Sequence, residues 1–285
     1  MKKCTKCFHE SAFEHEGVQV CIHCGNTEPL LQSEKKSFTE EEKRLFVLND
    51  VANKYFQFCL QKDQKAKNYI QQRLSTEQMQ QFGVGYANSD WTATKQYLIN
   101  KGFTEKEITS AGITFLAKNG KSYDFFRERI IFPIRDSNGN IVGFSGRTIV
   151  GDDRKYINTS ENLVFHKKQG FFNLDKTNAD LDTVVLVEGQ MDVIALHCAG
   201  VPNVLATLGT ALTISHAHIL KHMGVKKVFL CFDGDTAGQN ACQKAQKLLK
   251  KVDIEFDTSV SFRDCKDPDE FVAKYGKEEA RKLFN

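Results

Sequence analysis

The pattern of apolar and polar positions changes along the chain. From residue 181 onward, short apolar runs alternate with segments whose apolar residues recur every three to four positions. Strands that alternate with helices in this way predict a parallel sheet with covering helices. The expected strands are TVVLV, NVLAT, KVFLCF and IEFDTSV, and the expected helices cover residues 190–199, 214–223 and 237–251.

The middle of the chain has a different pattern, helical first and β-rich afterwards. LFVLNDVANKYFQFCL has apolar residues at helical spacing, and further helices are expected over residues 64–73, 91–100 and 105–111. Beyond Arg129, IIFPI and NIVGFSGRTI flank Asp136-Ser137-Asn138-Gly139, a turn sequence suited to a hairpin. This segment is therefore expected to be α+β, so that the fold class is α/β with an α+β N-terminal part.

These patterns divide the chain into four expected domains. Residues 1–32 are rich in cysteine, and residues 33–44 (SEKKSFTEEEKR) are charged and nearly free of apolar side chains, which is typical of a linker. Residues 45–180 form the α+β segment and residues 181–285 the α/β segment. We find no internal repeat and no low-complexity tract.

Composition is that of a globular protein. The 285 residues are 41% hydrophobic and 26% charged, enough for one large or two modest cores and a small appendage. No apolar run reaches the ~18 residues of a membrane span. Met1-Lys2-Lys3-Cys4 leads into cysteines and not into an apolar signal core, so we expect a cytoplasmic location and no membrane association.

The distribution of charge says more than the net value of +3. Residues 45–180 hold 19 Lys and Arg against 14 Asp and Glu, whereas residues 181–285 hold 13 against 14. A basic middle segment beside a carboxylate-rich end suits polyanion binding next to a metal site.

Four cysteines near the N-terminus have the spacing of a zinc ribbon. Cys4 and Cys7 form one pair, and Cys21 and Cys24 form another after thirteen residues, so that four thiolates can surround one tetrahedral ion. Nearby histidines could substitute, although four thiolates make that unnecessary. The zinc folds a segment too small for its own core. Contact of the ribbon with nucleic-acid bases is a second role that its Lys and Phe residues would allow.

Carboxylates gather at the expected strand ends of the C-terminal segment. Glu188 closes TVVLV, and Asp233 and Asp235 come at the end of KVFLCF, at the edge of the sheet where open α/β folds bind ligands. Further acidic residues come close by: Asp192, Asp267 and Asp269. Like charges this dense repel unless cations bind, and Mg²⁺ or Mn²⁺ prefers oxygen ligands.

Helix capping is the alternative explanation for individual acids. Asp235 precedes an expected helix, and Asp267 or Asp269 could cap the last one. Capping would account for one such residue, but E-G-x-x-D, D-G-D and D-P-D at one sheet edge favour a metal site.

Several motifs together resemble DnaG-type bacterial or phage primases of the TOPRIM superfamily. The C-terminal motifs are VEGQMD at 187–192, LGT at 208–210, FDGD at 232–235 and DPD at 267–269. The upstream blocks YIQQR, SYDFFRER, GFSGR, KYIN and FHK, within residues 69–167, are similar to primases in particular. The resemblance covers roughly residues 45–285.

The resemblance implies roles for particular residues. Glu188, Asp233 and Asp235 would be the principal catalytic metal ligands, and Asp192, Asp267 and Asp269 would support a second metal or the incoming triphosphate. The residues expected to line a nucleotide and template groove are Arg73, Arg147, Lys155, Tyr156 and Lys167. Arg147 and Lys155 are expected at the surface, while Arg129 and Lys168 are also compatible with a solvated surface.

Two departures from the family pattern limit this transfer. The ribbon is a short four-cysteine one, closer to that of fused phage primase-helicases, and we expect no counterpart of the family's C-terminal helicase-binding domain. A replicative helicase is therefore an open candidate partner, and a phage or mobile-element origin is expected.

The expected function is DNA-primase activity: DNA-dependent synthesis of short RNA primers on single-stranded DNA from ribonucleoside triphosphates. Two-metal nucleotidyl transfer needs no protein nucleophile, and His216, His218 and His222, on one expected helix, are interpreted as surface groups. The alternatives are a TOPRIM-type metal-dependent nuclease and a non-catalytic single-stranded-DNA-binding replication accessory. The expected cofactors are structural Zn²⁺ and catalytic Mg²⁺ or Mn²⁺.

Overall fold

A computed structural model describes residues 12–15, 18–21, 27–29, 38–151, 154–177 and 182–284. In the first three ranges it gives the course of an antiparallel sheet of three short strands, β1 (Ala12–His15), β2 (Val18–Cys21) and β3 (Thr27–Pro29). The predicted zinc site lies outside the described residues, apart from the backbone of Cys21 in β2.

The described chain divides into two compact units. One unit comprises Glu40–Lys167 and Phe172–Asp175, and we call it the N-terminal unit. The other contains Lys168–Phe171 and the chain from Lys176 onward, and we call it the C-terminal unit. The four expected domains stay a prediction.

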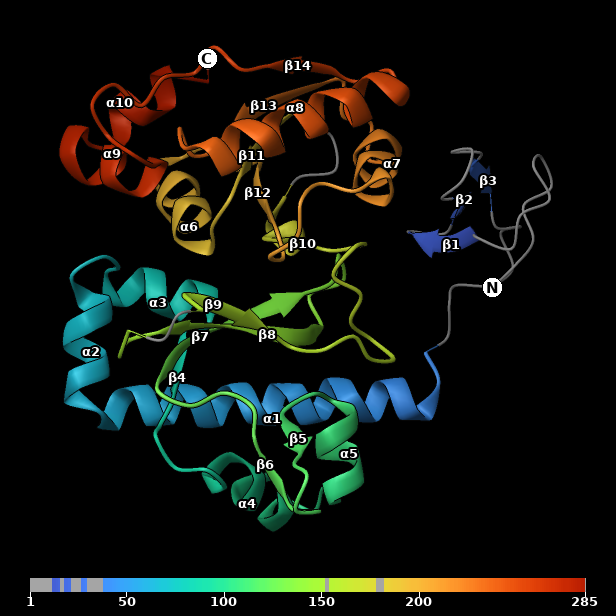
Figure 1. Cartoon of the computed structure of the whole chain (residues 1–285), viewed down its shortest axis with the longest axis vertical. Helices are drawn as coiled ribbons and strands as arrows, with labels where there is room; N and C mark the ends of the chain where they lie inside the picture. The colour runs from blue at the N-terminus through green and yellow to red at the C-terminus, as the bar shows by residue number, and fades with distance from the viewer. Residues whose placement is uncertain are drawn as a thin grey trace. The chain divides into compact units, whose positions relative to one another are not determined.

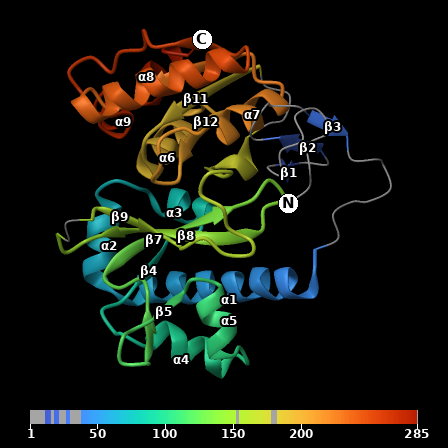
Figure 2. The same ribbon diagram turned by 45° about the vertical axis from the view of Figure 1, so that its right-hand side comes forward.

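The N-terminal unit is built on a long helix, α1 (Glu40–Lys62), that lies against an antiparallel sheet in both views (Figures 1 and 2). Acidic side chains in the first turn of α1 and Lys62 in its last turn suit the helix dipole. Gly85 allows the first strand to approach α1, because a Cβ there would lie 2.5 Å from the Cβ of Phe56. The sheet has the order β4 (Gly85–Ala87), β7 (Arg129–Arg135), β8 (Ile141–Thr148) and β9 (Tyr156–Asn158).

The expected hairpin of the middle segment is confirmed. Strands β7 and β8 pair antiparallel around the turn that contains Gly139, which has a φ of 83°. Nearly every residue of both strands is buried, so side chains on both faces of this hairpin are covered. Helix α1 packs against β4 and β8. Two short helices follow α1, namely α2 (Gln64–Gln71) and α3 (Thr76–Phe82).

A small lobe lies on the other side of α1 from the sheet (Figure 1). It consists of α4 (Ala93–Asn100), α5 (Glu105–Ser110) and the antiparallel strands β5 (Thr114–Leu116) and β6 (Ser122–Asp124). Thr104 begins α5 with a capping box, in which its hydroxyl accepts from Glu107 N while the Glu107 carboxylate accepts from Thr104 N.

The C-terminal unit confirms the predicted alternation of strands and helices. Its five-stranded sheet has the order β10-β12-β11-β13-β14, and β11 pairs parallel with both β12 and β13, while β13 pairs parallel with β14. The strands are β10 (Phe171–Phe172), β11 (Thr183–Val187), β12 (Val204–Thr207), β13 (Lys227–Cys231) and β14 (Glu255–Asp257). The helices are α6 (Gln190–Ala199), α7 (Ile214–His222), α8 (Thr236–Lys251), α9 (Pro268–Tyr275) and α10 (Lys277–Lys282). The 3₁₀ turn η1 (Leu174–Lys176) precedes β11 in the chain, and its first two residues belong to the N-terminal unit.

Helices α9 and α10 pack beside α6, so that the last part of the chain lies next to the helix that follows the first acidic strand end. Across the described parts of the chain, no helix combines the length and the apolarity that a membrane crossing requires.

Candidate metal and nucleic-acid sites

Glu188 and Asp233 meet at the carboxyl edge of the parallel sheet. Strands β11 and β13 are neighbours with Val187 opposite Cys231, so the residues that follow them emerge side by side. The backbone N–H of Asp233 donates to Oε1 of Glu188 at 2.9 Å. Glu188 is exposed and Asp233 is half-buried, so both can reach a ligand from solvent.

Asp235 caps helix α8 at this edge. Its Oδ1 accepts from the N–H of Gly238 at 2.8 Å, and the side chain is exposed. Glycine is required at 238, because a Cβ there would lie 2.1 Å from the carbonyl oxygen of Asp233 and 2.8 Å from Oε1 of Glu188. The start of α8 is thereby packed directly against the two acidic strand ends.

Asp192 is the buried member of the acidic group. Its Oδ2 accepts from Gly189 N at 3.1 Å and its Oδ1 from Asp269 N at 3.4 Å. Burial raises the pKa of Asp192 to about 7, with further upward contributions from the charges of Asp267, Asp269 and Asp233. Negative charge at this position is therefore expensive without a compensating cation.

The capping alternative is correct for two of the acids. Asp235 caps α8, and Asp267 caps α9 by accepting from Glu270 N at 2.8 Å. Each cap uses one carboxylate oxygen, so capping does not exclude a second role for the other oxygen. Among the described residues, no three Asp, Glu, His or Cys side chains are arranged as a ready metal cage.

The donors nevertheless fit a hard divalent cation. They are carboxylate oxygens, several are exposed, and the like charges that raise the pKa of Asp192 would be relieved by a cation. First-turn N–H groups of α8 and α9 donate to Asp235, Asp192 and Asp267, which lessens the repulsion among these carboxylates.

The residues predicted to line a nucleotide and template groove differ in their exposure. Arg73 and Lys155 are exposed, and Tyr156 is half-buried in β9. Lys167 is half-buried, and its backbone N–H donates to Oε1 of Glu161 at 2.9 Å.

Arg147 corrects the expectation of a surface group. It is 7% exposed, and its guanidinium donates from Nε to the Tyr69 hydroxyl and from Nη1 to the Tyr156 hydroxyl, both at 2.9 Å. Arg129 is also buried and donates to the carbonyl oxygens of Gly146 and Arg154. Both arginines therefore hold the sheet together, which the sequence did not indicate because their partners are distant or are backbone groups.

His216 is likewise not a surface group. It is fully buried, its Nδ1 accepts from Thr213 N at 3.1 Å, and its Nε2 lies 3.1 Å from the carbonyl oxygen of Gly170. The Thr213 hydroxyl donates to the carbonyl oxygen of Lys168 at 3.0 Å. These contacts fix the backbone of residues 168–170, while the Lys168 side chain is exposed as expected. His218 and His222 are half-buried.

An exposed aromatic group that the sequence analysis missed lies before α4. The ring of Trp91 is 54% exposed, with the Arg127 guanidinium 4.0 Å from its centroid and the Tyr123 ring edge-on at 5.5 Å. An indole beside a cation is suited to stacking with a nucleic-acid base. The signal in the sequence is the chain's single Trp, which stands in the polar stretch NSDWT where a helix is expected to begin.

The parallel sheet with acidic strand ends defines a Toprim-like domain, preceded by a domain of primase type. The family described as "Toprim-like" matches residues 185–272, and the family described as "DNA primase catalytic core, N-terminal domain" matches residues 55–178. A DNA primase of Clostridium acetobutylicum is 40% identical over 248 residues, which are 86% of this chain and 41% of that protein.

Solved structures agree. The Aquifex aeolicus primase, with zinc-binding and RNA polymerase domains, is 30% identical with a TM-score of 0.77, over 94% of this chain and 72% of that one. A DnaG primase catalytic domain bound to ssDNA is 33% identical with a TM-score of 0.73, over 85% and 81% of the two chains. The chain belongs to the DnaG-type DNA primase family. It spans less than half the length of the Clostridium relative.

Proposed function

We propose that this chain is the catalytic core of a DNA primase, a DNA-dependent RNA polymerase that joins ribonucleotides on a single-stranded DNA template. The observation that carries the proposal is the meeting of Glu188 and Asp233 at one sheet edge, with Asp235 at the start of α8, in a chain of this family. The RNA polymerase domain named for the Aquifex relative supports the reaction class.

In this proposal Glu188, Asp233 and Asp235 hold Mg²⁺ or Mn²⁺. When bound, such cations lower the pKa of a ribonucleotide 3′-hydroxyl and neutralise the triphosphate, so that the α-phosphate is transferred in line. The backbone N–H of Asp233 orients the Glu188 carboxylate, and the cap on α8 orients Asp235. Asp192, Asp267 and Asp269 extend the negative surface toward a second cation or the triphosphate.

The N-terminal unit supplies the nucleic-acid contacts. Exposed Arg73 and Lys155 suit phosphates, half-buried Tyr156 and Lys167 suit nucleotides, and the Trp91 ring with Arg127 suits an unpaired base. Arg147 is buried and stabilises this surface, because its guanidinium donates a hydrogen bond to the Tyr156 hydroxyl. The relative bound to single-stranded DNA supports the template class.

The remaining predictions extend the proposal. Residues 1–32 would form the Cys4, Cys7, Cys21 and Cys24 zinc ribbon, followed by a linker at 33–44, the basic segment at 45–180 and the catalytic domain at 181–285. The Aquifex relative, whose name includes a zinc-binding domain, supports this order. A helicase partner, a phage or mobile-element origin and a cytoplasmic location stay predictions.

The test is incubation with single-stranded circular DNA, labelled ribonucleotides and Mg²⁺ or Mn²⁺. A ladder of short RNAs is expected. Loss of the template would select the TOPRIM-type nuclease, and binding without either product would select the accessory protein.

The matched pair of variants is Asp235→Asn and Asp235→Ala. Asparagine caps helices as well as aspartate does, so Asp235→Asn keeps the start of α8 and removes only the charge. We expect both variants to lose primer synthesis and only the alanine variant to lose stability, by about 1 kcal/mol. Primer synthesis at the parental rate by a folded Asp235→Asn protein would contradict the metal assignment.

A further inference from the structure

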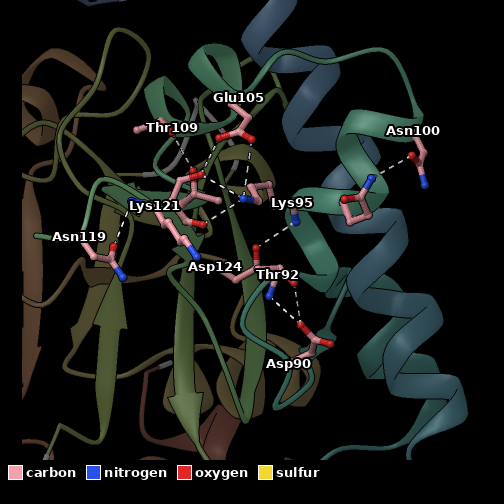
Figure 3. Close-up of polar contacts among 12 residues, drawn as sticks. Asp90, Thr92, Lys95, Asn100, Glu105, Thr109, Asn119, Lys121 and Asp124 are labelled. Carbon is pink, nitrogen blue, oxygen red and sulfur yellow. Dashed lines mark hydrogen bonds and ion pairs between the residues drawn. The ribbon is translucent and has the colours of Figure 1, made fainter. Parts of the chain in front are cut away.

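A buried carboxylate in the small lobe caps a helix from far away in the sequence. Asp124, at the end of β6, is 1% exposed. Its Oδ2 accepts from Thr94 N at 2.7 Å and its Oδ1 from Lys95 N at 2.9 Å, so it binds the first turn of α4 (Figure 3). Thr92, the residue in the N-cap position, makes no capping bond with its own side chain. Asp124 therefore does for α4 what a local cap does for other helices.

The same residue is connected to the exposed Trp91 by its backbone. The N–H of Asp124 donates to the carbonyl oxygen of Trp91 at 2.7 Å, and Nη1 of Arg127 donates to the carbonyl oxygen of Asp124. Arg127 in turn lies over the Trp91 ring. Asp124 thus contacts the backbone that carries the indole, the helix that follows it and the cation that stacks on it.

The loop that carries Trp91 is held at its other side as well. Oδ1 of Asp90 accepts from Thr92 N at 2.7 Å, and Oδ1 of Asn88 accepts from Asp90 N at 3.1 Å. Asp90 and Thr92 are drawn with Asp124 in Figure 3. The backbone around Trp91 is therefore fixed, while its ring remains half exposed.

We propose that Asp124 is a positioning residue for nucleic-acid binding, which holds Trp91 and Arg127 as a preformed stacking surface for an unpaired base. The proposal rests on the proposed function, because the ligand is the single-stranded template. Its physical basis is preorganisation: a ring that is already oriented loses less conformational entropy when a base stacks on it.

The charge state of Asp124 should then affect binding. Burial raises the pKa of Asp124 to about 6, against the lowering effect of the Thr94 and Lys95 N–H groups. A protonated carboxyl keeps one good acceptor oxygen and turns the other into a donor, so one of the two bonds to α4 is lost.

Other charged and titratable groups surround this carboxylate. Asp90 also raises its pKa, and Arg127 faces it from the following loop. Tyr55 faces it from α1. On α4, the Lys95 amino group is held by the Ser122 carbonyl oxygen at 3.0 Å and lies 3.8 Å from Glu105 of α5. With its pKa raised to about 6, Asp124 loses its negative charge as the pH falls from 7.5 to 5.

The chain offers a direct reporter, because Trp91 is its single tryptophan. Tryptophan emission of the full chain reports the environment of this ring alone, and anisotropy of a labelled single-stranded oligonucleotide reports affinity. The variants are Asp124→Ala, Asp124→Asn, Trp91→Ala and Thr104→Ala. The last removes a helix cap in the same lobe that does not contact Trp91, and so controls for loss of a cap.

At pH 7.5 we expect Asp124→Ala to shift the Trp91 emission of the free protein and to weaken binding about tenfold, as Trp91→Ala does. Asp124→Asn, which keeps one acceptor oxygen, should fall between Asp124→Ala and the wild type. Thr104→Ala should bind as the wild type does. Between pH 7.5 and pH 5 the wild type should converge on Asp124→Asn, since its own carboxyl becomes protonated.

Two results would overturn the inference. Wild-type affinity in a folded Asp124→Ala protein, or a constant affinity ratio between the wild type and Asp124→Asn across this pH range, would leave Asp124 with a structural role only. If Trp91→Ala also binds normally, the Trp91 contact of the proposed function fails with it. A weakened Trp91→Ala beside a normal Asp124→Ala would overturn the positioning role alone.

Discussion

Asp192 and Asp124 are both buried carboxylates with raised pKa values, yet their surroundings differ. In the C-terminal unit, burial and three neighbouring aspartates raise the pKa of Asp192 to about 7. In the N-terminal unit, burial raises the pKa of Asp124 to about 6, and its two carboxylate oxygens accept hydrogen bonds from N–H groups in the first turn of α4. Both carboxylates accept two backbone N–H groups, so the difference lies in the neighbouring charge: three aspartates beside Asp192 indicate a site that a cation would stabilise, whereas the contacts of Asp124 indicate a structural connection.

The largest expected effect concerns the acidic edge of the C-terminal unit. Glu188→Gln keeps a carbonyl oxygen for the N–H of Asp233 and removes the charge. Primer synthesis should fall by roughly a hundredfold or more, with the melting temperature unchanged. Primer yield beside a melting curve without metal measures both quantities. A parallel loss of stability and activity would weaken the contrast between the two units.

The second prediction tests the like-charge explanation at Asp192. Its folded pKa of about 7 exceeds the unfolded value of 3.8, so its contribution to stability is full below pH 3.8 and is lost as the pH rises through about 7. The metal-free protein should lose up to roughly 4 kcal/mol from this residue across that window. Asp192→Asn has no carboxyl group to titrate, so its stability should decrease less as the pH rises. Urea unfolding at pH 4.5, 6 and 7.5 gives the free energy of unfolding at each pH. An equal dependence on pH in the wild type and in Asp192→Asn would contradict the prediction.

A third prediction concerns Arg147, which joins Tyr69 and Tyr156 inside the N-terminal unit. Arg147→Ala leaves both hydroxyls without this donor and empties a buried site, so the free energy of unfolding should fall by about 2–3 kcal/mol. Arg147→Lys should recover only part of this, since an ammonium cannot reach both hydroxyls in the same geometry. Chemical unfolding measures the change. A decrease in the free energy of unfolding below 0.5 kcal/mol would contradict a structural role for Arg147 and favour a solvated side chain.

The smallest effect is expected at exposed Lys155. Lys155→Ala should leave stability within about 0.5 kcal/mol and weaken single-stranded DNA binding a few-fold. The slope of log affinity against log salt should decrease by roughly one if Lys155 contacts a phosphate. An unchanged slope would place the phosphate contact elsewhere.

The fold of the C-terminal unit could be predicted because its information is local. Strands buried on both faces are continuous apolar runs, and amphipathic helices separate them, so β11 and α6 were found with the bounds that the structure gives. Between the expected helices 64–73 and 91–100 no element was expected, yet the structure has α3 and β4 there, and the second helix begins only at Ala93, after the Trp91 loop. Helices and strands of three to seven residues are too short for a regular spacing of apolar residues to be recognised.

The sites were predictable only where chemistry follows strand ends. The meeting of Glu188 with Asp233 follows from parallel neighbours, whereas the burial of Arg147 depends on Tyr69, 78 residues away, and that of His216 on Gly170, 46 residues away. Asp124 was missed for the same reason, because its partner helix begins some thirty residues earlier. Long-range partners of polar groups leave no periodic pattern in a sequence.

Gly238 and Gly234 have opposite consequences for genetic variation. A Cβ at 238, in the first turn of α8, would collide with the Asp233 backbone, whereas a Cβ at 234, four residues earlier, meets no atom within 4 Å. In a library of codon variants selected for replication, codon 238 should return glycine alone, and codon 234 should accept small residues. Missense alleles at 238 should therefore behave as nulls, which makes this codon a marker for inactive copies of the gene.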